Sequence, residues 1–126
     1  MRMGGSSMAK IVVIDDSKLM RKFLRHQLEA EGHSVEEWED LSAMEIGDKV
    51  AASAPDLVIS DYMMPGCNGL TVAKMVRKAQ PALPVLIITS HRDPDIMEQL
   101  RKQEVVEILH KPLDVDKLKE ALRLLL

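Results

Sequence analysis

The sequence predicts an α/β domain in which a parallel sheet is covered by helices on both faces. Short apolar runs rich in β-branched residues alternate five times with segments whose apolar residues recur at helical spacing. Strands joined through helices pair in parallel, and right-handed crossovers place those helices on the two faces of the sheet. A chain of 126 residues is long enough for one compact domain with a real core and too short for two.

Residues 10–14 form the first predicted strand, because every position after Lys10 is apolar, as in a strand buried on both faces. A helix is predicted over residues 17–31, and Gly32 ends it, since glycine is common just past helix ends. Its apolar residues recur at helical spacing: Leu19, Met20, Phe23, Leu24 and Leu28. Residues 33–38 are more polar and predict a strand near an edge of the sheet.

The middle of the chain continues the alternation of helix and strand. A second helix is predicted over residues 41–53, and Pro55 precedes a clear strand at residues 56–60. The loop predicted over residues 61–69 is rich in turn-forming residues: Pro65, Gly66, Asn68 and Gly69. One face of a third helix is marked by three apolar residues: Leu70, Ala73 and Val76.

The last part of the chain supplies two more strands and two more helices. Residues 84–89 predict the most apolar strand of the sequence, and residues 105–109 predict the fifth strand. A short fourth helix is indicated by Ile96, Met97 and Leu100. A stripe at helical spacing predicts the final helix: Val115, Leu118, Leu122 and Leu125.

Composition argues against several classes of protein. The net charge is −3, so the whole chain offers no strongly basic surface for nucleic acid or an anionic membrane. No apolar run approaches the roughly 20 residues that span a bilayer. Cys67 is the single cysteine, so no disulfide can form within the chain, which fits a reducing cytoplasm. Residues 1–8 lack the apolar stretch of a signal peptide, and we expect an added leader or disordered segment before one domain at residues 9–126.

Polar side chains gather where the predicted strands end. They are Asp15 and Asp16 after the first strand, Asp61 after the third, Thr89 at the end of the fourth, and Lys111 after the fifth. The carboxyl ends of parallel strands meet at one edge of a sheet, where functional groups collect. We therefore expect three carboxylates, a hydroxyl and an ammonium group to converge at this edge.

Three carboxylates in one place repel one another. Two unit charges about 4 Å apart interact by roughly 4 kcal/mol at an effective dielectric constant of about 20. Such a cluster either raises its pKa values or recruits a cation. Oxygen ligands without nitrogen or sulfur favour Mg²⁺, which keeps several waters and leaves room for phosphate oxygens. With Lys111 to neutralise a further oxygen and an aspartate as nucleophile, the edge predicts a phosphoryl-transfer site.

Four stretches of the sequence carry a resemblance to a known family. They are IVVIDDSKLMR at residues 11–21, LVISDYMMPGCNG at 57–69, LIITS at 86–90 and HKP at 110–112. In this order and at these spacings they resemble the response-regulator receiver family, and most of all its stand-alone chemotaxis regulators. The resemblance covers residues 9–126 and implies a doubly wound, flavodoxin-like (βα)5 fold with five parallel strands in the order 2-1-3-4-5.

The resemblance also implies roles for the acidic residues. Asp61 would be the phosphoacceptor, attacking a phosphohistidine of a histidine kinase or of a phosphotransfer protein. Asp16 would bind Mg²⁺ directly and Asp15 largely through water. Asp61 and the backbone carbonyl of Met63 would be further ligands of the metal.

The remaining site residues and the output follow from the same resemblance. Lys111 would hold a phosphoryl oxygen, Thr89 would move its hydroxyl onto the phosphoryl group, and the bond between Lys111 and Pro112 would be cis. A phosphoryl group adds about 1.5 to 2 negative charges, enough to change affinity for an unidentified output domain or partner protein. The domain would catalyse only its own phosphorylation and dephosphorylation, with neither nucleic acid nor membrane as its partner.

Among the positions that depart from the family pattern, three bear on switching or on hydrolysis of the acyl phosphate. Ile108 stands three residues before Lys111, where the family usually has an aromatic switch residue. We therefore expect signalling to be muted, or to use another element, on the face formed by the fourth helix, fifth strand and fifth helix. Met63 and His91 occupy positions that in the family modulate hydrolysis of the acyl phosphate, and together they leave its lifetime open.

Other interpretations of the same residues remain open. Asp15 and Asp16 could simply cap the following helix, and Thr89 could be an ordinary strand residue. One alternative function is a small phosphatase or phosphotransferase with an aspartate nucleophile, although the chain has no insertion large enough for a cap. Another is a receiver that has lost phosphorylation and serves as a binding module, which the presence of Asp16, Asp61 and Lys111 disfavours.

Overall fold

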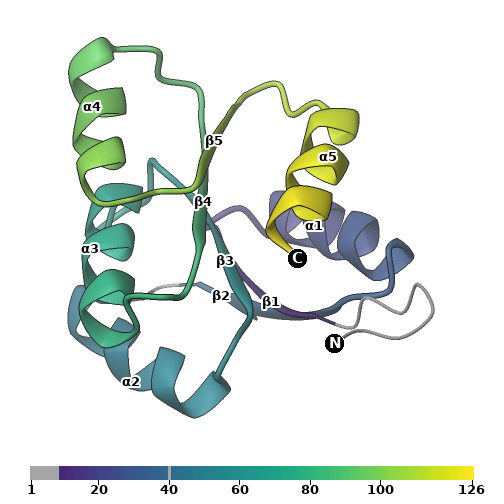
Figure 1. The fold of residues 1–126 in the computed structure, drawn as a ribbon, viewed down its shortest axis with the longest axis horizontal. Helices are drawn as coiled ribbons and strands as arrows, with labels where there is room; N and C mark the ends of the chain where they lie inside the picture. Colours follow the sequence, from purple (N-terminus) through teal and green to yellow (C-terminus); the bar gives the residue numbers. More distant parts are fainter. Residues whose placement is uncertain (1–8, 40) are drawn as a thin grey trace.

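The computed structural model describes residues 9–39 and 41–126; residues 1–8, for which the sequence predicts a leader, lie outside the described part of the chain. Strands and helices alternate along it (Figure 1). The strands are β1 (Lys10–Ile14), β2 (Ser34–Trp38), β3 (Leu57–Asp61), β4 (Val85–Thr89) and β5 (Glu107–His110). The helices are α1 (Lys18–Ala30), α2 (Ala43–Ser53), α3 (Gly69–Ala79), α4 (Pro94–Lys102) and α5 (Val115–Leu125). Within these ranges no helix is both long and apolar enough to cross a membrane.

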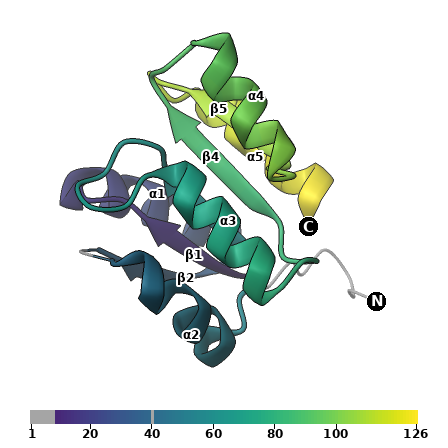
Figure 2. The ribbon, with the colours of Figure 1, turned by 90° about the vertical axis from the view of Figure 1, so that its left-hand side faces the viewer.

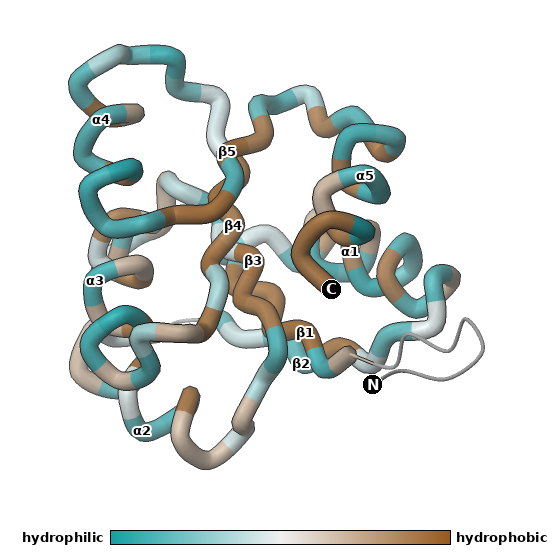
Figure 3. The backbone as a smooth tube through the Cα atoms, viewed as in Figure 1, coloured by the Kyte–Doolittle hydropathy of each residue, from teal (hydrophilic) through white to brown (hydrophobic). Residues whose placement is uncertain are grey.

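The sheet has its five strands in the order β2-β1-β3-β4-β5, and every neighbouring pair is parallel. This confirms the predicted doubly wound, flavodoxin-like fold. All residues of β3 and β4 are buried, and these central strands are strongly apolar in Figure 3. β2 and β5 form the edges and are partly exposed, which agrees with the more polar sequence of residues 33–38.

Helices cover both faces of the sheet. Figures 1 and 2 show α2, α3 and α4 on one face and α1 and α5 on the other. Because successive strand residues point to opposite faces, the strands feed two separate apolar cores. The core under α2, α3 and α4 takes strand residues that include Val12, Val58 and Ile87, and the core under α1 and α5 takes Ile11, Ile59 and Ile88.

Two predicted strands end later than the sequence indicated. β3 includes Asp61, which pairs in register with Ile88 of β4. β5 begins at Glu107 and includes His110, which pairs with Thr89. Glu104 has a left-handed backbone conformation with φ 61°, so the chain is still turning where apolar residues suggested a strand. Both corrections move the carboxyl end of the strand by one residue toward the edge that carries the polar side chains.

The exposed face of α1 also differs from the simple apolar pattern. Leu19 is 82% exposed and Phe23 is 38% exposed, although both belong to the predicted apolar set. Arg21 is buried in their place, beside Leu24 and Leu28 on the same helix. The residue that α1 buries nearest to the polar edge is therefore a cation.

Candidate functional site

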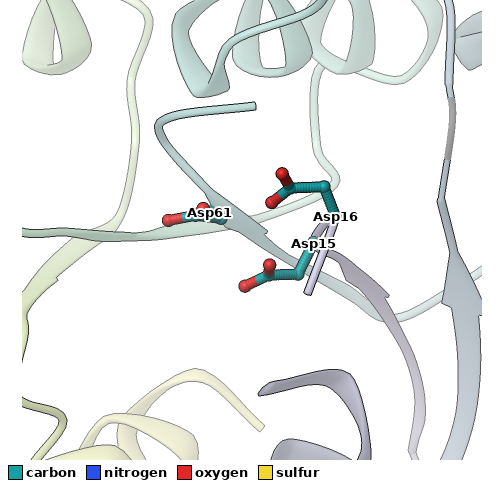
Figure 4. A group of neighbouring side chains, drawn as sticks. All are labelled: Asp15, Asp16 and Asp61. Carbon is teal, nitrogen blue, oxygen red and sulfur yellow. The ribbon is translucent and has the colours of Figure 1, made fainter. Parts of the chain in front are cut away.

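Three carboxylates meet at the carboxyl ends of β1 and β3. Asp15 and Asp16 follow β1 directly, and Asp61 is the last residue of the neighbouring strand β3. One oxygen from each of the three lies within 4.8 Å of the others, and Figure 4 shows the side chains turned toward a common space. Asp15 and Asp61 are buried, whereas Asp16 is exposed. The predicted convergence of Asp15, Asp16 and Asp61 is therefore present.

The turn after β1 fixes Asp15 while leaving Asp16 free of protein partners. The carboxylate of Asp15 accepts a hydrogen bond of 2.8 Å from the backbone N–H of Ser17. The hydroxyl of Ser17 is the N-cap of α1 and accepts from the N–H of Met20. Helix capping thus falls mainly to Ser17, and among the described residues no hydrogen bond or ion pair engages the carboxylate of Asp16.

The surroundings of Asp15 make its carboxyl group costly to ionise. Burial raises its pKa, and the nearby carboxylates of Asp61 and Asp16 raise it further. The Ser17 N–H and the charge of Lys111 oppose these effects, and the pKa of Asp15 is about 6 instead of the ordinary 3.8. Three close oxygen donors with such mutual repulsion fit a hard divalent cation, which removes the cost of ionising them.

We expect Asp15→Asn to stabilise the protein when divalent cations are removed. A raised pKa means that the stability contributed by Asp15 is present below pH 3.8 and is lost as the pH rises through about 6. At neutral pH the variant should raise the free energy of unfolding by about 1–3 kcal/mol, from the ~1.4 kcal/mol that each unit of pKa represents. Thermal unfolding with chelator and with Mg²⁺ measures this, and Mg²⁺ should stabilise wild type more than the variant. A loss of stability in chelator would contradict the electrostatic account.

Lys111 and Thr89 complete the predicted set. The Nζ atom of Lys111 lies 3.0 Å from a carboxylate oxygen of Asp61, so the two form an ion pair at the edge of the sheet. The peptide bond between Lys111 and Pro112 is cis, as the resemblance implies. Thr89 is 1% exposed, and its hydroxyl oxygen accepts a hydrogen bond of 2.9 Å from the N–H of His91. Among the described residues, no hydrogen bond joins Thr89 to Asp61.

Of the positions that depart from the family pattern, His91 contacts the site through its N–H bond to Thr89. His91 packs edge-on against Tyr62, with ring centroids 5.4 Å apart, so a ring pair links the ends of β3 and β4. The side chain of Met63 is 59% exposed. Ile108 is half-buried in β5. The role of the Met63 carbonyl as a metal ligand stays a prediction.

Gly69, which the sequence indicated only as a turn residue, packs closely against the backbone at the end of β3. A Cβ atom on Gly69 would lie 2.9 Å from the Cα of Tyr62 and 3.1 Å from the carbonyl oxygen of Asp61. The N–H of Gly69 also donates to the carbonyl of Tyr62 at 2.7 Å. The start of α3 is therefore pressed against the backbone that carries Asp61.

Gly69→Ala is expected to destabilise the protein by about 1–3 kcal/mol, because backbone rather than a flexible side chain must move. Gly47→Ala is the matched control, since its Cβ would meet only the Cβ of Ala79 at an ordinary 3.8 Å. Removing a helical glycine there should stabilise by about 0.5–1 kcal/mol. Urea unfolding of both variants measures the two values, and equal effects would contradict the close approach at Gly69.

Arg21 is the second residue that sequence reasoning missed. Its guanidinium donates a hydrogen bond of 2.7 Å to the backbone carbonyl of Asp15. The signal in the sequence was a charged residue spaced three and seven positions before the buried Leu24 and Leu28. An apolar residue is the usual occupant of such a position, so a buried arginine there implies a specific set of acceptors.

The comparisons with known proteins agree on one family of domains. The family model of the response regulator receiver domain matches residues 11–123. The DNA-binding transcriptional regulator NtrC of Klebsiella pneumoniae is 35% identical over 104 residues, which cover 82% of this chain and 22% of NtrC. The transcriptional regulatory protein FixJ of Bradyrhizobium diazoefficiens is 33% identical over 108 residues, covering 86% of this chain and 52% of FixJ. The matched segment is thus a minor part of NtrC and about half of FixJ.

Among solved structures, the chemotaxis protein CheY4 of Vibrio cholerae superposes with a TM-score of 0.84 at 29% sequence identity. The superposition covers 95% of this chain and 100% of CheY4. The similarity in fold therefore extends over nearly the whole chain.

Proposed function

The chain belongs to the response regulator receiver domain family of two-component signalling, and on that basis we propose that Asp61 is its phosphoacceptor. The observation that carries this proposal is the ion pair of 3.0 Å between Asp61 and Lys111, set beside the carboxylates of Asp15 and Asp16. Asp61 is the carboxylate that lies between a fixed cation and two further oxygen donors. A phosphoryl group at Asp61 would therefore meet charge of the opposite sign on both sides once a metal is bound.

In the proposed reaction, a carboxylate oxygen of Asp61 attacks the phosphorus of a phosphohistidine. The new O–P bond makes a mixed anhydride, the P–N bond breaks, and the electron pair stays on the imidazole nitrogen, which takes a proton from solvent. Lys111 is placed to hold a phosphoryl oxygen during this step. The hydroxyl of Thr89, whose oxygen accepts from the His91 N–H, would donate its hydrogen to a phosphoryl oxygen.

The acidic cluster can bind a metal ion, and its chemistry favours Mg²⁺. Oxygens of Asp15, Asp16 and Asp61 would hold it, with the Met63 carbonyl as a further ligand. When bound, Mg²⁺ neutralises charge that develops on the phosphoryl oxygens. The raised pKa of Asp15 supports this assignment, because a carboxylate that is costly to ionise alone gains most from a cation.

Intact-mass measurement after incubation with acetyl phosphate tests the proposal. We expect one phosphoryl adduct that forms with Mg²⁺ and fails to form with chelator. The adduct should be lost on standing, because an acyl phosphate hydrolyses. Absence of any adduct would favour a receiver that only binds partners. Continuous release of phosphate from a generic phosphate ester would favour the alternative of a small phosphatase.

Receiver domains of response regulators interact with histidine kinases and output domains. We propose that the kinase contacts the exposed apolar pair on α1. Leu19 and Phe23 lie one helical turn apart, and α1 begins directly after Asp16 and Ser17. A protein that presents a phosphohistidine to Asp61 must cover this end of the molecule. The apolar pair gives such a partner surface to bury beside the site.

The face formed by α4, β5 and α5 is the one on which the sequence predicts muted signalling, because Ile108 stands where the family usually has an aromatic residue. A hollow of about 520 Å³ is lined there by Arg92, Met97, Arg101, Val105, Val106, Glu107, Ile108 and His110. Ile108 has no ring to turn into this hollow. We propose that the signal from Thr89 uses another element, namely the contact of its hydroxyl with His91, whose ring packs on Tyr62.

A further inference from the structure

We propose that Arg21 is a positioning residue for the metal site, because its buried guanidinium fixes the backbone carbonyl of Asp15 and thereby the placement of Asp16. This inference rests on the proposed function, in which Asp15 and Asp16 bind Mg²⁺. Arg21 itself contacts neither metal nor substrate. Its effect is carried by the peptide unit that joins the two aspartates.

The guanidinium of Arg21 is engaged on three sides. One terminal nitrogen donates to the carbonyl of Asp15 at 2.7 Å, Nε donates to Glu37 at 3.2 Å, and the other terminal nitrogen donates to Glu39 at 3.0 Å. The side chain of Arg21 is only 5% exposed, so these contacts replace water instead of competing with it. A planar fork that reaches a carbonyl and two carboxylates at once is a geometry specific to arginine.

The carboxylate that anchors Arg21 is held in its charged form. Burial alone would raise the pKa of Glu37, but hydrogen bonds and charge from Lys22 and Arg25 outweigh it and lower the pKa to about 2. Glu37 accepts from Arg25 at 2.6 Å and from Lys22 at 3.0 Å, and its side chain is 11% exposed. Arg21 is therefore tied to an edge strand, β2, by an acceptor that stays ionised.

The bond from Arg21 completes the fixation of the loop after β1. The N–H of Asp15 points to the carbonyl of Trp38 at 3.4 Å, and its carboxylate accepts from Ser17. With its carbonyl bound to Arg21, the peptide plane between Asp15 and Asp16 cannot turn freely. The carboxylate of Asp16 has no protein partner among the described residues, so the position of its backbone is what aims it at the site.

Arg25 offers a matched control within the same network. It lies one turn further along α1 and shares the acceptor Glu37, but it contacts Glu29 instead of Asp15. Lysine at either position keeps the positive charge and removes the fork. A residue that only stabilises the link between α1 and β2 should give the same result at both positions.

The test measures Mg²⁺ affinity by isothermal titration calorimetry on wild type, Arg21→Lys and Arg25→Lys, with no phosphodonor present. We expect Arg21→Lys to weaken Mg²⁺ binding by about ten-fold or more, the loss typical of residues that orient metal ligands, and Arg25→Lys to leave it unchanged. In NMR spectra of the metal-free protein, the chemical shift of the Asp16 backbone amide nitrogen should change in Arg21→Lys and stay unchanged in Arg25→Lys. Thermal unfolding measures how much each substitution destabilises the protein.

Equal affinities in the two lysine variants, whether both weakened or both intact, would overturn the inference and leave the proposed function standing. Wild type that fails to bind Mg²⁺ would instead overturn the metal requirement of the proposed function. If Arg21→Lys does not fold, Glu39→Gln decides, because Glu39 is 57% exposed and its loss loosens Arg21 without burying a new charge. Weaker Mg²⁺ binding in Glu39→Gln supports the positioning role, and unchanged binding overturns it.

Discussion

Replacing Asp61 by asparagine is expected to abolish the phosphoryl adduct altogether. The amide of asparagine is not a nucleophile toward phosphorus, and the two other carboxylates of the cluster lack the contact of 3.0 Å with Lys111 that Asp61 has. The side chain is nearly the same size, so the buried end of β3 keeps its packing. Intact mass after acetyl phosphate, and Trp38 fluorescence with beryllofluoride as an acyl-phosphate mimic, measure the loss.

Asp48→Asn is the control for Asp61→Asn. Asp48 is exposed on α2 and lies outside the acidic cluster, so its replacement should leave adduct formation unchanged. Trp38 is suited to report on the site, since its carbonyl faces the N–H of Asp15. Persistence of a full adduct in Asp61→Asn would move the phosphoacceptor to another residue and would refute the proposed roles of the site.

Lys111→Met is expected to slow phosphorylation by acetyl phosphate on the order of 100-fold, the usual cost of removing one fixed donor to a developing negative charge. The same change should strengthen Mg²⁺ binding, because the ammonium of Lys111 lies 3.0 Å from Asp61 and repels an incoming cation. The two effects have opposite signs. Stopped-flow kinetics and calorimetric titration with Mg²⁺ measure them separately.

Lys117→Met controls for the loss of one positive charge near the end of β5. Lys117 lies on α5 and shares a surface hollow with Lys111, but its ammonium makes no ion pair with the site in the described structure. It should change neither rate nor affinity. If Lys111→Met weakened Mg²⁺ binding, the ion pair with Asp61 would not have the electrostatic role assigned to it.

The architecture was readable from the sequence because the central strands are short and apolar and because strands and helices alternate regularly. Ile11 to Ile14 and Val85 to Ile88 are buried on both faces, so their composition alone distinguishes them from amphipathic helices. The acidic cluster followed from that prediction, since strand ends in a parallel sheet share one edge. Thr89 and Lys111 were placed at the same edge by the same rule.

The residues that the sequence did not reveal depend on tertiary contacts. Arg21 sits in a helix whose apolar residues Leu19 and Phe23 turn to solvent, and its acceptors come from β2 and from the backbone of Asp15. The constraint on Gly69 comes from the backbone of β3, which no local pattern encodes. Likewise, the start of β5 depends on the left-handed turn at Glu104 rather than on propensity.

The most direct test of the central claim is to locate the acyl phosphate in the sequence. Borohydride reduces an acyl phosphate to an alcohol, so a phosphorylated aspartate is converted to homoserine, which peptide mass spectrometry identifies by position. We predict homoserine at Asp61 after treatment with acetyl phosphate and Mg²⁺, and none when Mg²⁺ is chelated. Homoserine at Asp15 or Asp16, or at no position, would contradict the assignment of Asp61 as phosphoacceptor.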